Sequence, residues 1–371
     1  MVNEERLLNT FLELVQIDSE TGHEEIIQPI LKRKFEALGL KVVEDQAQQE
    51  TGFGANNLIC TLPATHTEYD KIYFTSHMDT VEPGRNVKPI IKENGFIYSD
   101  GTTVLGADDK AGLAVIFEVL EVIQEQNLQH GQIQFVITVG EESGLVGAKA
   151  LRKDDLDADY GYAIDSSVPV GHITTGAPYQ SKVNATIHGK KAHASTPEEG
   201  ISAINIAAKA ISQMKLGQID HETTANIGKF QGGGPTNVVT DLVNIWAEVR
   251  SHSKEKLDAQ IEHMEKTFQS TAEQFNCHAE VETSLSYPGF RIQPEDKVYQ
   301  IAEQASRALG FDMQVNVGGG GSDGNIINKL GIPSVILGVG YEKIHTTDER
   351  ISTQSLNDLA NYVLKIIEIA K

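Results

Sequence analysis

The sequence contains very little cysteine, which limits what can hold the fold together. Cys60 and Cys277 are the only cysteines in 371 residues. One pair cannot build the disulfide framework of a small secreted domain, and neither residue lies beside a histidine in a metal or nucleophile motif. We therefore expect two buried free thiols and a fold that depends on its hydrophobic core.

Long apolar runs and an excess of positive charge are also missing. No run approaches the about 20 apolar residues that span a bilayer, and residues 1–5 lack the basic and apolar regions of a signal peptide. The chain has 31 Lys and Arg against 52 Asp and Glu, and its formal net charge of -21 opposes binding to phosphate backbones and anionic lipid. We expect a cytoplasmic protein with neither nucleic acid nor membrane as a partner.

Helical and strand patterns alternate in the first and last parts of the chain, which is typical of an α/β sheet sandwiched by helices. The length suffices for roughly two domains. The helical patterns cover residues 4–16, 24–38, 109–127, 299–309 and the chain from 352 onward. The apolar strand patterns are Ile72-Tyr73-Phe74, Ile133 to Val139 with alternate apolar residues on one face, Tyr162-Ala163-Ile164 and Val335-Ile336-Leu337.

The pattern changes between residues 177 and 289. It consists of a strand, a helix, two strands, a helix and a strand, at residues 181–188, 201–214, 226–230, 237–250, 255–275 and 278–284. A small sheet with two helices in this order resembles a ferredoxin-like α+β domain. We predict a discontinuous α/β catalytic domain with a mixed sheet, residues 1–176 and 290–371, interrupted by a lid or dimerisation domain at residues 177–289.

Five short polar clusters stand far apart along the chain, and several directly follow a strand pattern. Their key residues are His77, Asp108, the pair Glu141-Glu142, Asp165 and His345. In an open α/β sheet ligands bind at the carboxyl ends of strands, so separate strands can deliver these side chains to one crevice. Two imidazoles and three carboxylates suit zinc or a similar divalent ion. These five ligands are one more than a single tetrahedral ion binds, which suggests two ions that share a bridging carboxylate.

Each cluster taken alone has an ordinary explanation. His77 and Asp79 share one face of an extended strand end, so Asp79 can accept the second ring N–H of His77, but the pair could equally be surface residues. Asp108 opens a helical pattern, where a carboxylate serves either as an N-cap or as a bridge between cations. Glu141 and Glu142 have no nearby Lys or Arg, and adjacent buried acids need a cation or proton to compensate them. Their joint occurrence favours the metal site.

The run from Asp100 to Gly112 resembles the peptidase T group of di-zinc metallopeptidases. That superfamily also contains aminoacylases, carboxypeptidase G and succinyl-diaminopimelate desuccinylase. The remaining motifs follow in the family's order, namely residues 76–80, 140–144, 164–165, 318–323 and His345. The resemblance covers essentially the whole chain and implies a zinc-peptidase domain with two Zn²⁺ per subunit, for which Co²⁺ or Mn²⁺ could substitute.

The resemblance implies which residues bind the ions. His77, Asp108 and Asp165 would hold one zinc ion. Asp108, Glu142 and His345 would hold the other, so that Asp108 is shared.

It also implies the residues that act on the substrate. Glu141 would be the catalytic base. In the inserted domain, His193 matches a lid histidine that donates to the oxyanion, and Asn237 and Arg250 match residues that bind a substrate carboxylate. The glycine run that includes Gly320 and Gly321 would allow close backbone approach beside the substrate; a phosphate loop is the alternative, but no Lys follows in Walker spacing.

We expect a zinc-dependent exopeptidase of the peptidase T type, an aminopeptidase that acts on short peptides such as tripeptides. An N-acyl amino acid hydrolase or a carboxypeptidase-like enzyme would share every catalytic residue. A non-catalytic peptide-binding protein is a third interpretation, and the presence of Glu141 beside all five ligands argues against it. Some relatives supply the lid histidine from a second subunit, so the resemblance allows a homodimer through the inserted domain.

Overall fold

The computed structural model describes all 371 residues, which form two compact units. The discontinuous unit comprises Met1–Gly176 and Arg291–Lys371, and the inserted unit comprises Ala177–Phe290. The short strands β9 (Gly176–Ala177) and β17 (Phe290–Arg291) stand where the chain passes from one unit to the other. The sequence predicted an insertion at residues 177–289, and the function of that segment as a lid stays a prediction.

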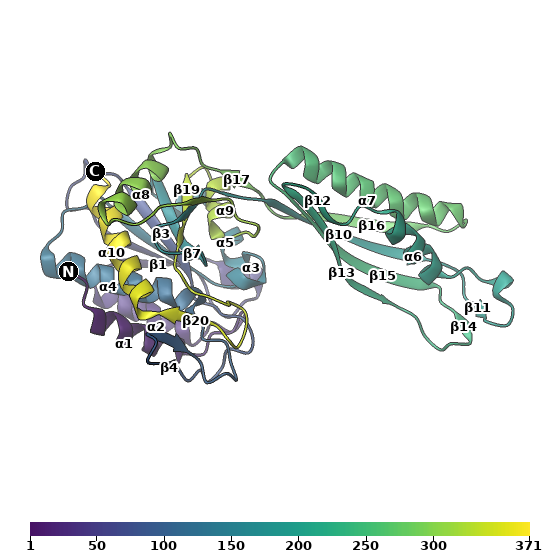
Figure 1. Cartoon of the computed structure of the whole chain (residues 1–371), viewed down its shortest axis with the longest axis horizontal. Coiled ribbons are helices and arrows are strands. Elements are labelled where there is room, and N and C mark those ends of the chain that lie inside the picture. Colours follow the sequence, from purple (N-terminus) through teal and green to yellow (C-terminus); the bar gives the residue numbers. More distant parts are fainter. The chain divides into compact units, whose positions relative to one another are not determined.

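An eight-stranded mixed sheet forms the centre of the discontinuous unit (Figure 1). In spatial order its strands are β1 (Lys41–Glu44), β2 (Leu58–Leu62), β6 (Ile133–Thr138), β3 (Ile72–His77), β7 (Tyr160–Ser166), β19 (Ser334–Gly338), β8 (Ile173–Thr174) and β18 (Val315–Asn316). The central strands β6, β3, β7 and β19 are parallel, whereas β1, β2 and β8 join their neighbours β2, β6 and β19 in antiparallel pairs. The carboxyl ends of the central strands therefore meet at one edge.

Helices cover both faces of this sheet, so the predicted α/β class is confirmed. They are α1 (Glu4–Val15), α2 (Ile27–Ala37), α3 (Ala47–Thr51), α4 (Ala107–Gln126), α5 (Val146–Ala150), α8 (Lys297–Ala308), α9 (Asp323–Lys329) and α10 (Thr353–Ile369). On one face the hydroxyl of Tyr162 donates to the carbonyl of Val298 in α8, at 3.2 Å. On the other face Gly324 in α9 packs closely on Ala163.

A chain of aromatic rings fixes the first of these faces. The ring centroids of neighbouring residues are 4.6–6.3 Å apart, along the series Phe117, Phe35, Phe135, Phe74 and Tyr162. Aromatic pairs at such separations contribute about 0.5–1.5 kcal/mol each beyond the burial of their area. The rings join α2 and α4 to three parallel strands, so this core holds the strand ends at fixed positions.

All six residues of β6 are buried, because the strand lies inside the sheet with helices on both sides. Two predicted details were wrong. The predicted strand 237–250 is two strands, β14 (Val238–Val239) and β15 (Leu242–Ser251). Cys60 is buried as predicted, but Cys277 is only partly buried because it follows the end of a helix at the edge of the inserted unit.

The inserted unit has a five-stranded antiparallel sheet with helices on one face (Figure 1). The strands in spatial order are β12 (Gly217–Asp220), β13 (Thr223–Gly232), β15, β10 (Tyr179–His188) and β16 (Ala279–Tyr287). The helices are α6 (Ala203–Gln213) and α7 (Lys254–Gln274). Apart from β12, the chain order is the β-α-β-β-α-β order of a ferredoxin-like domain.

Only one face of this second sheet is covered within its own unit. Val183, Ala185 and Ile187 alternate along β10 and pack beneath the two helices, while the residues between them lie on the open face. At one end of the unit β11 (Ala192–His193) pairs with β14. No helix of the protein has both the length and the apolar character that crossing a membrane requires.

Candidate metal centre

The adjoining ends of three parallel strands carry several of the predicted site residues. His77 is the last residue of β3, Asp165 lies near the end of β7, and Glu141 follows β6 in a short 3₁₀ turn. The ligand atoms of these three side chains all lie within 4.8 Å of one another. Those of His77, Asp108 and Glu142 form a second group of the same size. The structure thus brings residues from distant parts of the chain into one cluster.

Asp108 faces both predicted histidines. Its Oδ1 lies 3.1 Å from Nε2 of His77, and its Oδ2 lies 3.3 Å from Nε2 of His345. Nε2 of His345 is also 2.9 Å from Oε1 of Glu142. One carboxylate whose two oxygens point to two different imidazoles has the arrangement of a bridging ligand.

The alternative that Asp108 caps its helix is wrong. No backbone N–H of the helix donates to its side chain, which turns to the two histidines instead. The neighbouring Asp109 interacts with the helix instead, because its Oδ1 accepts the backbone N–H of Gly112 at 3.2 Å. Asp109 also accepts the hydroxyl of Ser76 at the end of β3. Asp109 is therefore the residue that caps the helix, and the carboxylate of Asp108 is available to bind a cation.

Asp79 joins the first histidine to the acidic pair. Nδ1 of His77 lies 3.0 Å from the carbonyl oxygen and 3.3 Å from Oδ1 of Asp79. The two carboxylate oxygens of Asp79 accept the backbone N–H groups of Glu141 and Glu142, at 3.0 and 3.3 Å. The hydroxyl of Thr21 donates to the same carboxylate at 2.8 Å. Asp79 consequently holds the turn that carries both glutamates as well as the imidazole ring.

Glu349 is a residue of the centre that the sequence patterns did not reveal. Its carboxylate is buried and accepts the backbone N–H groups of Leu105, Gly106 and Asp108, at 2.8, 2.8 and 3.0 Å. It lies just before β20 (Arg350–Ser352), which pairs with β5 (Phe96–Tyr98) and through it with β4 (Ile90–Ile91). This small sheet brings Glu349 to the loop that precedes Asp108.

Two further side chains complete the surroundings. The hydroxyl of Tyr341 donates to Oδ1 of Asp165 at 2.8 Å and so orients that carboxylate. Asp323 accepts the hydroxyl of Thr138, and burial raises the pKa of Asp323 to about 6. Asp323 closes the glycine-rich motif that the sequence showed, whereas nothing near Tyr341 marks it as part of a site.

The buried carboxylates of the cluster lie close together, and this shifts their pKa values. Burial raises the pKa of Glu141 well above its ordinary value, and the charge of Asp165 raises it further. Burial also raises the pKa of Asp165. Burial opposes the ionisation of Asp108 too, but hydrogen bonds from His345 and His77 lower its pKa well below the ordinary value. Hydrogen bonds to Asp108 and Glu142 raise the pKa of His345 to about 10. A cluster of this charge and donor set fits divalent cations, which would relieve the repulsion between the carboxylates.

A cavity of about 410 Å³ opens onto this cluster within the discontinuous unit. Its lining includes Asp108, Glu141, Glu142, Asp165, His345 and the run Gly318–Gly321, which contains the predicted Gly320 and Gly321. A Cβ placed on Gly319 would meet no atom within 4 Å. The glycine run therefore leaves space at the cavity wall for a bound molecule.

The three other predicted substrate residues all lie in the inserted unit. His193 is an exposed residue of β11 whose Nδ1 is 2.7 Å from the hydroxyl of Ser195. The carbonyl of Asn237, just before β14, accepts the N–H of Ala194 at 2.9 Å. Arg250 is a half-buried residue of β15, and its Nε donates to Glu248 at 2.8 Å.

The structure does not bring these three residues together within one chain. His193 and Asn237 adjoin each other in the β11–β14 pair, beyond the Leu242 end of β15 (Figure 1). Arg250 lies near the other end of that strand, eight residues from Leu242, which corresponds to roughly 26 Å of extended chain. A small molecule could contact only one of these two positions in the same copy of the unit.

Comparison with known proteins identifies the class. Peptidase family M20/M25/M40 matches residues 73–369, so the chain belongs to this family and is a metallopeptidase. The crystal structure of a tripeptidase from Staphylococcus aureus subsp. aureus mu50 is 63% identical, covers 100% of this chain and 99% of its own, and superimposes with a TM-score of 0.98. Aminopeptidase PepT from Bacillus cereus ATCC 10987 is 55% identical over 100% of both chains, with a TM-score of 0.94.

A third relative is similar over the full length. The uncharacterized protein YqjE of Bacillus subtilis (strain 168) is 56% identical over 371 residues, which are 100% of both chains. Together these similarities confirm the predicted resemblance to peptidase T-like metallopeptidases.

Replacement of Glu349 should weaken metal binding although Glu349 is not a predicted ligand. In Glu349→Gln an amide NH₂ replaces one of the oxygens that accept the backbone N–H groups near Asp108. The loop should shift, and metal affinity should fall by about 10- to 100-fold, as is usual when the support of a ligand is lost. Metal content after dialysis against graded chelator measures this.

The matched control is Glu342→Gln. Glu342 belongs to the same segment, but its side chain is 44% exposed and pairs with Arg350. Equal metal retention by the two variants would show that Glu349 does not position Asp108.

Proposed function

We propose that this protein is a metal-dependent aminopeptidase that hydrolyses an amide bond in short peptides, tripeptides in particular. The observation that carries the proposal is the Asp108 carboxylate, whose two oxygens face His77 and His345 at the wall of a cavity. The similarity to a tripeptidase and to PepT supports the reaction class. The cytoplasmic location stays a prediction from the sequence.

Five side chains would hold two ions. We propose His77, Asp108 and Asp165 for one and Asp108, Glu142 and His345 for the other, which is consistent with the contacts of Asp108. Imidazole nitrogen and carboxylate oxygen suit Zn²⁺, and Co²⁺ or Mn²⁺ could replace it. When bound, such ions polarise a carbonyl oxygen and lower the pKa of water towards about 7.

Glu141 would move the proton. It is buried beside His77 and Asp165, and burial raises its pKa, so it can hold a proton during the reaction. We propose that it takes a proton from the attacking water and passes it to the leaving amine. Asp79 holds the turn of Glu141 through a backbone hydrogen bond, and this fixes the position from which the proton is transferred.

The metal content and substrate preference test the function directly. The purified protein should hold close to two zinc-class ions at the centre, about 3.5–4 Å apart. Chelator should abolish the release of N-terminal residues from tripeptides, and Zn²⁺, Co²⁺ or Mn²⁺ should restore it. Full activity without any transition metal would contradict the proposal. Faster turnover of N-acetyl amino acids than of tripeptides would instead indicate the deacylase alternative.

Variants of Glu141 and Glu142 should show which of the two is the catalytic base and which is a metal ligand. Glu141→Gln should retain both ions but lose several orders of magnitude in kcat, because the substitution removes the proton acceptor and leaves coordination intact. Glu142→Gln should lose metal from one position, since Glu142 contacts His345. Metal analysis and kcat measured on the same preparations decide this. If Glu141→Gln lost an ion while Glu142→Gln kept both, the two roles would have to be exchanged.

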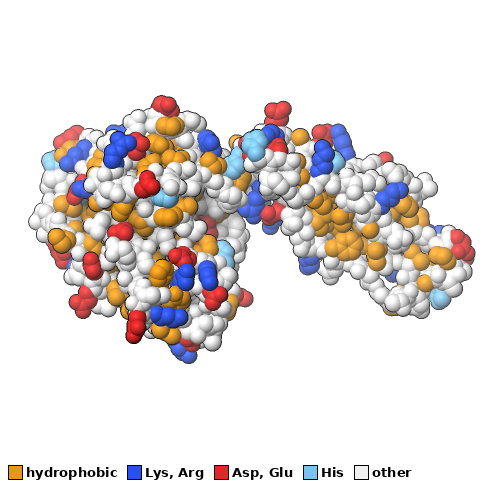
Figure 2. Space-filling view, in the orientation of Figure 1, with side chains coloured by type: hydrophobic (Ala, Val, Ile, Leu, Met, Phe, Trp, Pro, Cys, Tyr) orange, Lys and Arg blue, Asp and Glu red, His pale blue; other side chains and the backbone are white.

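The inserted unit would act as a lid and join two subunits. His193 and Asn237 are far from Arg250 within one unit. We therefore propose that each active site takes His193 and Asn237 from one subunit of a dimer and Arg250 from the other. Figure 2 shows hydrophobic side chains gathered over the strands of this unit, and Leu242 on its open face is 44% exposed. Exposed apolar patches of this kind mark interaction surfaces, which supports a dimer.

Mixing two inactive variants should test the shared site. His193→Ala should mainly lower kcat, because its oxyanion partner exists only in the transition state. If His193 acts in the partner's site, equal amounts of His193→Ala and Glu141→Gln should recover about a quarter of wild-type activity after subunit exchange. The recovery follows because half of the dimers are mixed and each has one intact site.

Arg250→Ala and His221→Ala serve as the comparison variants. Arg250→Ala should mainly raise KM, by roughly 10- to 150-fold for a lost hydrogen bond to a charged group. His221 is exposed in the same unit and should have no effect when replaced. Absence of recovery in the mixture would place His193 outside the partner's site, and wild-type kinetics of both His193→Ala and Arg250→Ala would remove them from the site altogether.

A further inference from the structure

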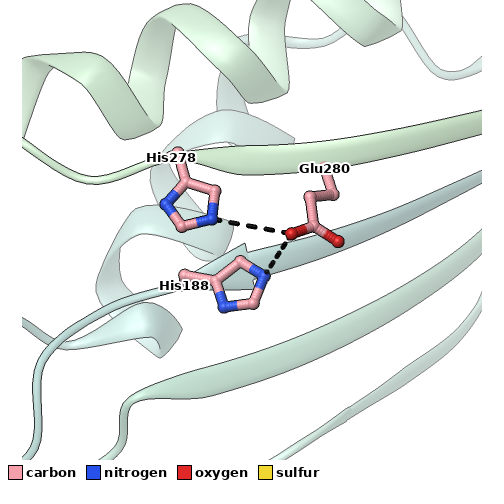
Figure 3. A group of neighbouring side chains, drawn as sticks. All are labelled: His188, His278 and Glu280. Carbon is pink, nitrogen blue, oxygen red and sulfur yellow. Dashed lines mark ion pairs between the residues drawn. The ribbon is translucent and has the colours of Figure 1, made fainter.

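A second group of metal-ligating side chains lies in the inserted unit. His188, His278 and Glu280 come from the end of β10, the residue before β16 and the second residue of β16 (Figure 3). Their ligand atoms all lie within 4.8 Å of one another. None of the three lines the catalytic cavity or belongs to the predicted catalytic residues.

The register of the sheet dictates this grouping. The backbone N–H of His188 donates to the carbonyl of His278 at 3.1 Å, which continues the ladder past the Ile187–Ala279 pair. The two histidines are therefore cross-strand neighbours, and Glu280 is two residues from His278, so all three side chains point to the same face. Ile187 points to the opposite face, beneath the helices. The histidines and the glutamate thus lie on the open face, on paired backbone.

Two of the distances are close to those between the ligands of a small cation. Oε1 of Glu280 is 3.3 Å from Nε2 of His188 and 3.6 Å from Nε2 of His278. For metal–ligand bonds of roughly 2.0–2.1 Å, neighbouring ligand atoms of a tetrahedral site are about 3.3 Å apart. Figure 3 shows both Nε2 atoms turned toward the carboxylate. Two imidazoles and one carboxylate are also a ligand set that zinc uses when it keeps a position for water.

One nitrogen of the group has no hydrogen bond. Nε2 of His188 is shielded from solvent and makes none, although Glu280 lies 3.3 Å away, and this is uncommon for a polar atom in a folded protein. The two imidazole rings stack with centroids 4.3 Å apart and an interplanar angle of 12°, so two protonated rings would repel each other. Glu280 forms ion pairs with these histidines and with no lysine or arginine. A divalent ion between neutral imidazoles and an ionised carboxylate would satisfy all three.

We propose that His188, His278 and Glu280 form a separate binding site for a divalent transition metal such as Zn²⁺, on the open face of the inserted unit. Glu280 belongs to β16, which is an edge strand of the sheet, His278 directly precedes that strand, and His188 ends its neighbour β10. The ion would therefore link the edge strand β16 to β10 and make it harder for β16 to separate from the sheet. This site does not depend on the proposed peptidase reaction.

Counting bound ions tests the site. The full-length protein should be brought to equilibrium by dialysis at a series of micromolar free zinc concentrations and its metal content measured. The wild type should hold one zinc ion per chain more than His278→Ala, whose affinity at this position should fall at least about tenfold when a ligand is lost. His188→Ala provides a second variant in case one of them folds poorly. Equal zinc content of the wild type and both variants would overturn the proposal.

The matched control is His221→Ala. His221 is a histidine of the same unit that also lies near a glutamate, Glu222 at 3.8 Å, but that pair belongs to no group of three metal-ligating side chains. Its replacement should leave the zinc content unchanged. A loss equal to that of His278→Ala would show that surface histidines bind zinc without a built site, which would also overturn the proposal.

Hydrogen exchange gives the location. Zinc should slow amide exchange in residues 276–284 of the wild type and leave this segment unchanged in His278→Ala, because the ion would bind the two strands together. The peptidase activity of His278→Ala should equal that of the wild type, so the outcome is independent of the catalytic centre. Zinc that slows this segment equally in both proteins would place the ion elsewhere and refute the proposed ligands.

Discussion

The crowding of negative charge at one edge of the parallel sheet is the constraint on which the rest of the structure depends. Asp108, Glu141, Glu142 and Asp165 share a small, mostly buried volume, where ionised carboxylates repel one another unless cations stand between them. Hydrogen bonds in the surrounding loops hold these side chains in place. Backbone N–H groups are tied to carboxylates just outside the cluster, chiefly Asp79 and Glu349, so the loops that carry the ligands cannot relax apart.

The sequence predicted those parts of the centre that leave a local pattern. Apolar runs of strand length end at His77 and near Glu141 and Asp165, and a strand end at the edge of a parallel sheet is where side chains converge. The helical stripe after Asp109 predicted α4 to within two residues at its start and one at its end. The sequence also predicted four strands and two helices in the inserted segment, because apolar residues alternate there above a covered face.

Other parts could not be read from the chain. Glu349 and Tyr341 support ligands more than 170 positions away, and an acid or a tyrosine in a loop carries no local signal of that use. Which of Asp108 and Asp109 serves the helix depended on backbone angles that only the folded loop defines. The group of His188, His278 and Glu280 is likewise a product of strand register, since its two histidines lie on strands separated by most of the inserted unit.

The insertion of one unit into another also orders events during synthesis. Residues 177–290 are continuous, so this unit is complete on the ribosome while the discontinuous unit still lacks β19, which lies between β7 and β8 in its sheet. Translation at about 5–20 residues per second leaves the apolar strands of the first segment without that partner for roughly 8–32 s. His345 emerges later still. The nascent chain therefore carries a finished domain beside an unfinished one and can gather the full set of metal ligands only when almost all of it has been made.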